Sequence, residues 1–264
     1  MYPIVTIFGK DFSMYAIMAV IGLLVAGFVF CYGIKKNGGD ESEATLFIIP
    51  VGLGMLIGGS VLYAITNITL FPLFLGVDSF NEFLDVLSIV FGGSVFYGGL
   101  FGAILFSNIY IKIFKLPKAV YIDNGALFAP IFHGFARIGC FFGGCCYGVE
   151  STFGFCAHGN EYTLIGEVRR FPVQLLESAL NFLIAIIIYL LLKKGKLKGR
   201  LFYVYLILYA LIRFFDEFLR GDQVRGFVFG VSTSQIISML ILVTVPFILA
   251  RASVKDKIIK NRWD

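Results

Sequence analysis

The sequence has little charge, and no polar stretch in it is long enough to form a separate water-soluble domain. Only 15% of the 264 residues are charged, whereas 58% are hydrophobic and the mean hydropathy is +0.88. Soluble domains carry about 25% charged residues, so this composition excludes an ordinary soluble fold. We therefore expect residues 1–264 to form a single transmembrane domain.

Two further patterns are missing from the chain. No small-residue cleavage site follows the first apolar run, so we expect Met1 to stay in the mature protein. The sequence also shows no inverted internal repeat, which is the pattern on which many secondary transporters are built. These absences argue against a removed signal peptide and against a transporter.

What the sequence does contain is a series of long apolar stretches. A helix that crosses a membrane needs roughly 20 mainly apolar residues. Stretches of about this length cover residues 12–34, 44–66, 88–114, 120–142, 172–192, 200–219 and 232–250. The sequence therefore predicts an all-α polytopic membrane protein with about seven transmembrane helices.

Lysine and arginine are unevenly distributed between the loops. Most of the 22 basic residues lie in alternate loops and in the tail, at residues 35–36, 112–118, 193–200 and 251–262. Cytoplasmic loops carry such an excess, so the N-terminus is predicted outside and the C-terminus in the cytoplasm. The clusters flank apolar stretches and lack interleaved aromatic residues, which indicates topology and no nucleic-acid partner. With this topology, residues 143–171 form the longest and most polar outward-facing loop.

Ionisable residues inside the apolar stretches are candidate functional groups, because a charge within a membrane is costly. Arg137 lies near the outer end of its stretch, at the level of lipid headgroups. Tyr209, Arg213 and Glu217 are spaced four residues apart and so share one helix face, with Arg220 beside them. Two buried guanidinium groups with few acids near them predict an anionic ligand such as a phosphate. The alternative is an internal Arg213–Glu217 ion pair that locks helices together.

The stretch from residue 172 to residue 192 opens with a proline, which suits the first turn of a helix. Gln174 and Glu177 lie three residues apart in it, so we expect both on one side of the helix, facing a cavity. The alternative for Glu177 is a helix cap on an interfacial polar face.

Four of the five cysteines, Cys140, Cys145, Cys146 and Cys156, lie in or beside the outward-facing loop. One interpretation is a metal site that uses His133 with Cys140 and the adjacent pair, although adjacent cysteines chelate one ion awkwardly. Another is a nucleophilic or redox-active thiol at Cys140, Cys145 or Cys146, activated by the arginines. The favoured interpretation is small buried side chains, or a disulfide such as one to Cys156. We therefore expect no metal ion and no other cofactor.

Taken in order, these residues resemble the prolipoprotein diacylglyceryl transferase family over nearly the whole chain. The segment RIGCFFGGCCYG from Arg137 resembles the family signature, and RFPVQLLE from Arg170 resembles its proline-x-glutamine helix start. The segment YALIRFFDEFLRGD from Tyr209 matches the family's tyrosine, arginine, glutamate and arginine. The matching residues are Tyr15, Gly58, Gly59, Tyr63, Arg137, Gly139, Phe141, Tyr147, Gly148, Pro172, Gln174, Glu177, Tyr209, Arg213, Glu217 and Arg220.

The chain also departs from the family pattern at several positions. Tyr97, within GGSVFYGGLFG, stands where the family carries an important histidine. These departures indicate a divergent, cysteine-rich paralogue. The family's two signature asparagines, its signature glutamate, an arginine and a further histidine are replaced by Cys140, Gly143, Cys145, Ser60 and Phe171 respectively.

The resemblance implies a multi-pass enzyme of the bacterial plasma membrane. Such an enzyme transfers the diacylglyceryl group of phosphatidylglycerol to the thiol of a prolipoprotein signal-peptide cysteine and releases glycerol phosphate. Arg137 and Arg213 would stabilise the phosphate leaving group, and Arg220 would act as a gate at the exit. The implied lipid- and phosphate-binding residues are Tyr15, Arg137, Gly139, Gly148, Gln174, Tyr209, Arg213 and Arg220.

The acceptor thiol must lose its proton, and the family's histidine is replaced here by Tyr97. Glu177, Glu217 or His133 would serve as the base, or Tyr97 would position the thiol. Tyrosine has an ordinary pKa near 10 and is a poor base at neutral pH. Glu177, Glu217, His133 and Tyr97 therefore join the two arginines as catalytic candidates.

Two other functions fit the same residues. A related transferase would move glycerol phosphate, or another lipid-derived group, onto a glycan or lipid acceptor and leave diacylglycerol in the membrane. In that case His158, Glu161, Arg169 and Arg170 of the outward-facing loop would hold a sugar. A lipid or anion transporter without chemistry would use the arginines only to bind phosphate.

Overall fold

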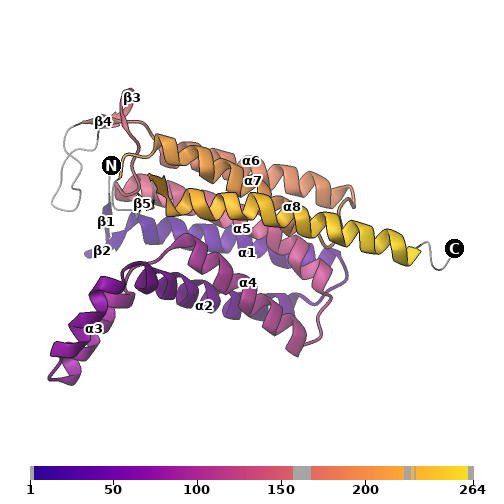
Figure 1. The fold of residues 1–264 in the computed structure, drawn as a ribbon, viewed down its shortest axis with the longest axis horizontal. Coiled ribbons are helices and arrows are strands. Elements are labelled where there is room, and N and C mark those ends of the chain that lie inside the picture. The colour runs from indigo at the N-terminus through magenta and orange to yellow at the C-terminus, as the bar shows by residue number, and fades with distance from the viewer. Residues whose placement is uncertain (1–2, 157–167, 223–226, 229, 261–264) are drawn as a thin grey trace. The chain divides into compact units, whose positions relative to one another are not determined.

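The computed structural model of this chain is a helical protein that divides into two compact units. The structure describes residues 3–156, 168–222, 227–228 and 230–260. The first unit comprises Met1–Gly33 with Ala119–Asp264, and the second comprises Ile34–Lys118. The all-α fold predicted from the apolar stretches is confirmed (Figure 1).

Long helices run side by side in the first unit (Figure 1). They are α1 (Met14–Lys36), α5 (Lys118–Gly143), α6 (Val173–Lys193), α7 (Leu201–Asp216) and α8 (Thr233–Lys260), and the short 3-10 turn η2 (Glu217–Leu219) follows α7. Three two-stranded antiparallel sheets lie at one end of these helices. Their strands are β1 (Ile4–Ile7) with β2 (Lys10–Ser13), β3 (Glu150–Cys156) with β4 (Arg169–Arg170), and β5 (Phe227–Val228) with β6 (Val231–Ser232).

An acidic cap fixes the start of α7 against α5. Asp123, which is 5% exposed, accepts hydrogen bonds from Gly199 N at 2.6 Å and Leu201 N at 3.0 Å. The first backbone N–H groups of a helix have no partner within the helix, so this carboxylate supplies one. The cap sits at the end of α5 opposite the end that carries the polar site.

The second unit consists of α2 (Glu41–Thr66), the 3-10 helix η1 (Ile68–Gly76), α3 (Phe80–Phe91) and α4 (Phe96–Ile113). Glycines bring α2 and α4 into close contact, because a Cβ atom at Gly54 would lie 2.5 Å from Gly102 O. A Cβ atom at Gly99 would similarly lie 3.0 Å from Met55 O. Small residues allow membrane helices to approach in this way.

The stretch 88–114 is not one helix, as the sequence predicts, but two. Helix α3 ends at Phe91 and α4 begins at Phe96. The break is stabilised against α2, because Val95 N donates to Gly59 O at 3.1 Å and Gly93 has room only for a hydrogen beside the Tyr63 ring. Continuing the helix through this glycine-rich segment would forfeit these contacts.

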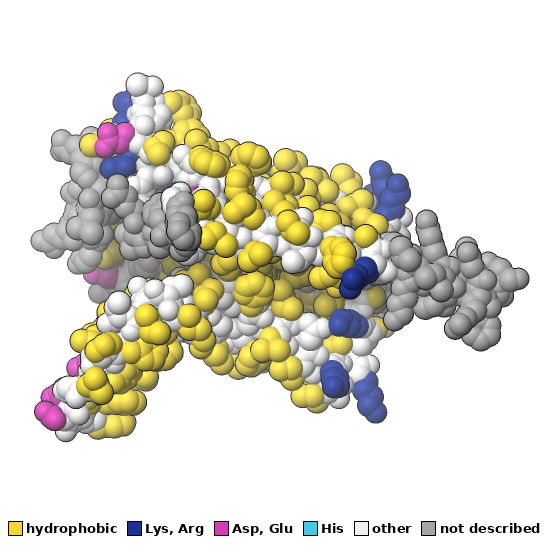
Figure 2. Space-filling view, in the orientation of Figure 1, with side chains coloured by type: hydrophobic (Ala, Val, Ile, Leu, Met, Phe, Trp, Pro, Cys, Tyr) yellow, Lys and Arg dark blue, Asp and Glu magenta, His cyan; other side chains and the backbone are white. Residues whose placement is uncertain are grey.

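Six described helices are long and apolar enough to cross a membrane: α1, α2, α4, α5, α6 and residues Thr233–Arg251 of α8. Helix α7 spans 16 residues and is followed by η2, so it is shorter than the predicted stretch 200–219. Hydrophobic side chains cover the helices of each unit, and lysines and arginines gather at helix ends (Figure 2). Exposed apolar side chains such as Leu24 and Phe28, 66% and 73% exposed, suit contact with lipid. The chain is therefore a polytopic membrane protein, and the orientation of its termini stays a prediction.

Candidate active site

A buried ion pair between α5 and α6 forms the centre of the polar site in the first unit. Arg137 Nη2 donates to Glu177 Oε1 at 2.8 Å, and the two residues are only 7% and 1% exposed. His133 lies one turn before Arg137, and its Nε2 atom is 3.8 Å from the same Glu177 oxygen. The carboxylate of Glu177 thus faces two side chains of α5.

Neighbouring contacts explain why α5 and α6 meet at this level. Ser178 Oγ of α6 donates to Gly134 O of α5 at 2.9 Å, and within α6 Asn181 Nδ2 donates to Glu177 O at 2.8 Å. A Cβ atom at Gly134 would lie 2.8 Å from the Phe182 ring, so only glycine lets that ring pack there. These contacts hold Glu177 in register with Arg137.

A second buried arginine comes from α7. Arg213 Nη2 pairs with Glu217 Oε2 at 2.7 Å and donates to Ser234 Oγ, in the first turn of α8, at 3.1 Å. The ring of Tyr209, also on α7, lies 5.1 Å from the ring of His133. This ring contact brings the polar face of α7 beside the Arg137 pair.

Each of these two guanidinium groups keeps a buried N–H group without a hydrogen-bond partner among the described residues. The groups are Nε of Arg137 and Nη1 of Arg213. Leaving a buried donor unsatisfied costs about 1–3 kcal/mol, so such atoms call for an explanation. Two unsatisfied cationic donors on α5 and α7 fit an anionic ligand that offers several acceptor oxygens, as a phosphate does.

Backbone hydrogen bonds join the loop after α5, which is predicted to face outward, to the segment after η2. Gly148 pairs with Arg220 in an antiparallel bridge, and Gly221 N donates to Tyr147 O at 3.0 Å. Arg220 Nε and Nη2 donate to the two carboxylate oxygens of Asp222 at 3.0 and 2.9 Å. Burial raises the pKa of Asp222, and the positive charge of Arg220 opposes that rise.

The arginines have more acidic neighbours than the sequence predicts. The expectation of few acids near them is wrong, because packing brings Glu177 from another helix and the chain turn brings Asp222 back toward Arg220. The Arg213–Glu217 ion pair is confirmed, but its two residues lie four positions apart in one continuous helical segment. It therefore does not lock two helices together, a role that falls to the Arg213 hydrogen bond with α8.

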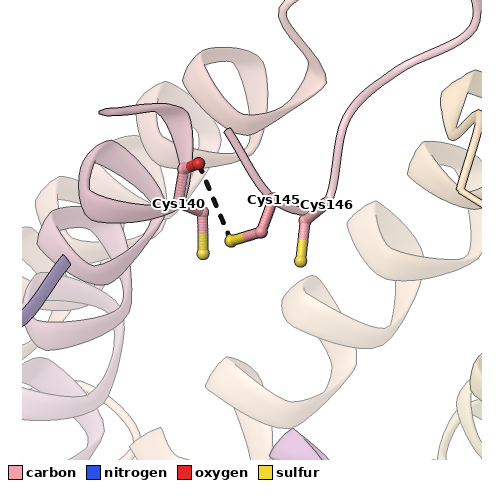
Figure 3. Close-up of side chains that lie close together, drawn as sticks. All are labelled: Cys140, Cys145 and Cys146. Carbon is pink, nitrogen blue, oxygen red and sulfur yellow. Dashed lines mark hydrogen bonds between the residues drawn. The ribbon is translucent and has the colours of Figure 1, made fainter. Parts of the chain in front are cut away.

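Three cysteines, Cys140, Cys145 and Cys146, form a thiol cluster at the C-terminal end of α5 (Figure 3). Their sulfur atoms all lie within 4.8 Å of one another, and Arg137 Nη1 is 3.8 Å from Cys140 Sγ. Hydrogen bonds from the Cys140 and Cys145 thiols lower the pKa of Cys146 well below its usual range. All five cysteines are free, so the predicted disulfide alternative is wrong. His133 is not part of this cluster, whereas the metal site considered from the sequence included His133 together with these cysteines.

Three predicted binding residues lie around the thiol cluster. A Cβ atom at Gly139 would lie 3.1 Å from Tyr15 Cα, so α1 packs closely against α5 at this glycine. Gln174, which is 1% exposed, donates from Nε2 to Cys145 O at 2.8 Å. Gln174 thus holds the turn that carries two of the three thiols. Gln174 and Glu177 are both buried, and the cavity expected beside them stays a prediction.

Tyr97 belongs to the second unit, in the first turn of α4. It is 3% exposed, and its ring lies 6.1 Å from the ring of Phe96. Its suggested role in positioning the acceptor thiol stays a prediction.

The loop residues considered for sugar binding are only in part described. Arg169 Nη1 donates to Thr152 O at 3.2 Å, and Arg170 Nη1 donates to Gly148 O at 3.3 Å. Arg170 also stacks over the Tyr147 ring at 4.5 Å. His158 and Glu161 lie outside the described residues.

Sequence reasoning missed several residues of the site. Ser178 joins α6 to α5 next to Glu177, and Ser234 accepts a hydrogen bond from Arg213, but single serines in apolar helices carry no distinctive pattern. Asp222 follows Arg220 by two residues, and this short spacing was a usable signal for an ion pair. Asp216 is 3% exposed, and its Oδ2 atom has no hydrogen-bond partner among the described residues.

Comparisons with known proteins match the chain over most of its length. A family model described as prolipoprotein diacylglyceryl transferase matches residues 3–251. A Clostridium tetani protein named phosphatidylglycerol–prolipoprotein diacylglyceryl transferase is 29% identical over 238 residues, covering 90% of this chain and 92% of that protein. A Clostridium perfringens protein with the same name and the number 2 is 32% identical over 246 residues, 90% of each chain. A similarly named Campylobacter lari protein is 34% identical over 241 residues, covering 89% and 87%.

Proposed function

Because this chain belongs to the prolipoprotein diacylglyceryl transferase family, we propose that it transfers the diacylglyceryl group of phosphatidylglycerol to a prolipoprotein cysteine. Its other product is then glycerol phosphate. The observation that carries the proposal is the pair of buried arginines, Arg137 and Arg213, each with an unsatisfied N–H donor. We place the enzyme in the bacterial plasma membrane, where its lipid donor lies.

The reaction is a displacement at carbon. The acceptor thiol loses its proton to water, and its sulfur attacks the glyceryl carbon that bears the phosphate. A carbon–sulfur bond forms as the carbon–oxygen bond breaks. The electron pair of that bond leaves on the phosphate oxygen. Donors aimed at the place where charge develops lower the barrier, and one such donor contributes roughly 100- to 1,000-fold in rate.

Arg137 and Arg213 supply these donors from two helices. Glu177 and Glu217 neutralise the arginines in the absence of substrate and hold their side chains. This arrangement lets the phosphate bind the remaining N–H groups without leaving net positive charge buried in the empty site. We assign the two glutamates as positioning residues.

Arg220 lies at the rim, where the outward-facing loop meets the segment after η2. Two N–H groups of its guanidinium donate hydrogen bonds to the carboxylate of Asp222. A phosphate that leaves the site can accept the same two hydrogen bonds as that carboxylate. Arg220 would therefore act as a gate by exchanging Asp222 for the departing phosphate. The bridge between Arg220 and Gly148 keeps the gate on a fixed backbone.

Mass spectrometry of the reaction products tests the proposal. Purified protein is incubated with phosphatidylglycerol and a peptide that carries a lipoprotein-signal cysteine, and wild type is compared with Arg137→Ala and Arg213→Ala. We expect a diacylglyceryl-thioether peptide and free glycerol phosphate from wild type and from neither of these two variants. Arg251→Ala is the matched control and should form both products, because Arg251 is exposed and its guanidinium lies over the Phe247 ring.

Two results would contradict the proposal. Intact phosphatidylglycerol after incubation would indicate transport or another donor. Diacylglycerol without modified peptide would indicate that the glycerol phosphate half is transferred, and the search would move to glycan acceptors.

A further inference from the structure

The thiol cluster gathers three soft ligand atoms beside the catalytic arginine. Cys140 lies in the last turn of α5, and Cys145 and Cys146 lie in the chain turn that follows the helix. Cys146 has a φ of +56°, in the left-handed region that few residues other than glycine adopt. This backbone conformation reverses the chain, so the adjacent cysteines place their sulfur atoms near that of Cys140 (Figure 3).

We propose that the thiol cluster is a binding site for one Zn²⁺ ion, held by the Sγ atoms of Cys140, Cys145 and Cys146. Thiolates select soft d¹⁰ ions of this kind. Zinc–sulfur bonds of about 2.3 Å in a tetrahedron place the sulfur atoms about 3.8 Å apart. The sulfur atoms already lie within 4.8 Å of one another, so modest side-chain rotations reach this geometry.

The charge of the surroundings suits such a centre. Three thiolates and one Zn²⁺ ion carry a net charge of −1, which is costly in a partly buried place. Arg137 Nη1, 3.8 Å from Cys140 Sγ, offsets that charge. Gln174 fixes the turn through its hydrogen bond to Cys145 O, so the ligand set is held before the ion arrives.

The fourth zinc position is open. No further histidine, cysteine or carboxylate in the described ranges joins the group of three thiols. Cys145 is exposed, so the site is accessible from outside. Zinc sites with three protein ligands and one open position are typical of catalytic centres, whereas structural sites use four.

The open position has a use that rests on the proposed function. An acceptor thiol that binds Zn²⁺ there loses its proton to water and becomes a bound thiolate. Its sulfur then attacks the glyceryl carbon, the carbon–oxygen bond to phosphate breaks, and glycerol phosphate leaves with that electron pair. The zinc ion remains divalent throughout. Metal activation would thus replace the family histidine that is absent at Tyr97.

Metal analysis of the full-length protein tests the site without relying on activity. The protein is purified under reducing, oxygen-free conditions, loaded with Zn²⁺ and dialysed against a weak chelator. We expect about one zinc per chain, and a loss of at least 100-fold in Zn²⁺ affinity in Cys145→Ser, because one of three protein ligands is removed. Cys156→Ser is the matched control and keeps its zinc, since Cys156 is not in the thiol cluster.

A spectroscopic readout covers the case in which a serine variant folds poorly. Wild-type protein loaded with Co²⁺ should show thiolate-to-cobalt charge-transfer absorption, which Zn²⁺ then abolishes by displacement. Wild-type protein that binds neither ion after reduction would overturn the proposal. A disulfide within the thiol cluster after anaerobic purification, or zinc binding that survives Cys145→Ser, would overturn it as well.

Removal of zinc separates the site from its role. Stripping the wild type with a strong chelator should lower transfer to the peptide thiol by about 100-fold, the lower end of what activating a proton transfer contributes, and Zn²⁺ should restore it. Unchanged transfer after stripping would overturn the activating role but leave the site. Zinc-loaded wild type that makes no thioether peptide would instead overturn the proposed function, with the zinc stoichiometry unaffected.

Discussion

The two units of the chain bury different chemistry. The first unit buries arginines, a histidine, carboxylates and amides between its helices, whereas residues 34–118 bury no charged side chain. The second unit instead packs through glycines of α2 and α4, whose backbones meet directly. Close packing of small residues stabilises a membrane protein without polar groups, and buried charge is retained where a ligand is to be bound.

The largest expected effect follows from breaking the central ion pair of the first unit. Arg137→Ala should lower the transfer rate by about 1,000-fold, because a phosphate donor is lost. It should also lower the free energy of unfolding by about 3–5 kcal/mol, because Glu177 is left buried and unpaired. Product formation and thermal unfolding in detergent measure the two effects.

A double variant separates these two consequences. Arg137→Met with Glu177→Leu removes both charges and should recover most of the stability, but not the activity. A double variant that regained transfer would contradict the role of Arg137 in binding the leaving group.

The second unit should respond to volume rather than to charge. Gly102→Val places a side chain against the Gly54 carbonyl on α2, so we expect a loss of about 1–3 kcal/mol in the free energy of unfolding. Gly52→Ala is the control, because no atom lies within 4 Å of a Cβ added there. Equal unfolding temperatures for the two variants would show that the glycine contact does not stabilise this unit.

A buried acid remote from the site sharpens the comparison within the first unit. Asp123→Ala removes the acceptor for Gly199 N and Leu201 N, and should cost about 1–2 kcal/mol in unfolding free energy, as lost helix caps do. The catalytic rate constant per folded molecule should not change. A large fall in that constant would show that Asp123 is coupled to the site.

The smallest expected effect concerns the orientation of the Arg213 guanidinium. Ser234→Ala removes one hydrogen bond, worth about 1 kcal/mol, and should lower transfer by about 5-fold. We expect the loss in kcat rather than in the KM for phosphatidylglycerol, because the bond orients a group that acts on the leaving phosphate. Ser234→Thr, which keeps the hydroxyl, should recover the rate.

The sequence predicted the positions of the helices better than it predicted the contacts between them. Apolar length identified every long helix, but the glycine-rich break at residues 92–95 depends on hydrogen bonds with α2 that a single stretch does not reveal. Spacing along one helix predicted the Arg213–Glu217 pair. The Arg137–Glu177 pair joins residues 40 positions apart, and no local pattern encodes it.

By itself, the sequence determined that this chain is a membrane protein, which arginines lie in its apolar helices and which family the chain resembles. Those properties depend on composition, on local spacing and on motifs that are read along the chain. Only the tertiary structure decided that Arg137 has an acidic partner on another helix, that an N–H donor of Arg137 and one of Arg213 have no partner among the described residues, and that three thiols meet beside Arg137. These features arise when helices and a reversed turn bring distant side chains within bonding distance, and such contacts cannot be read from sequence neighbours.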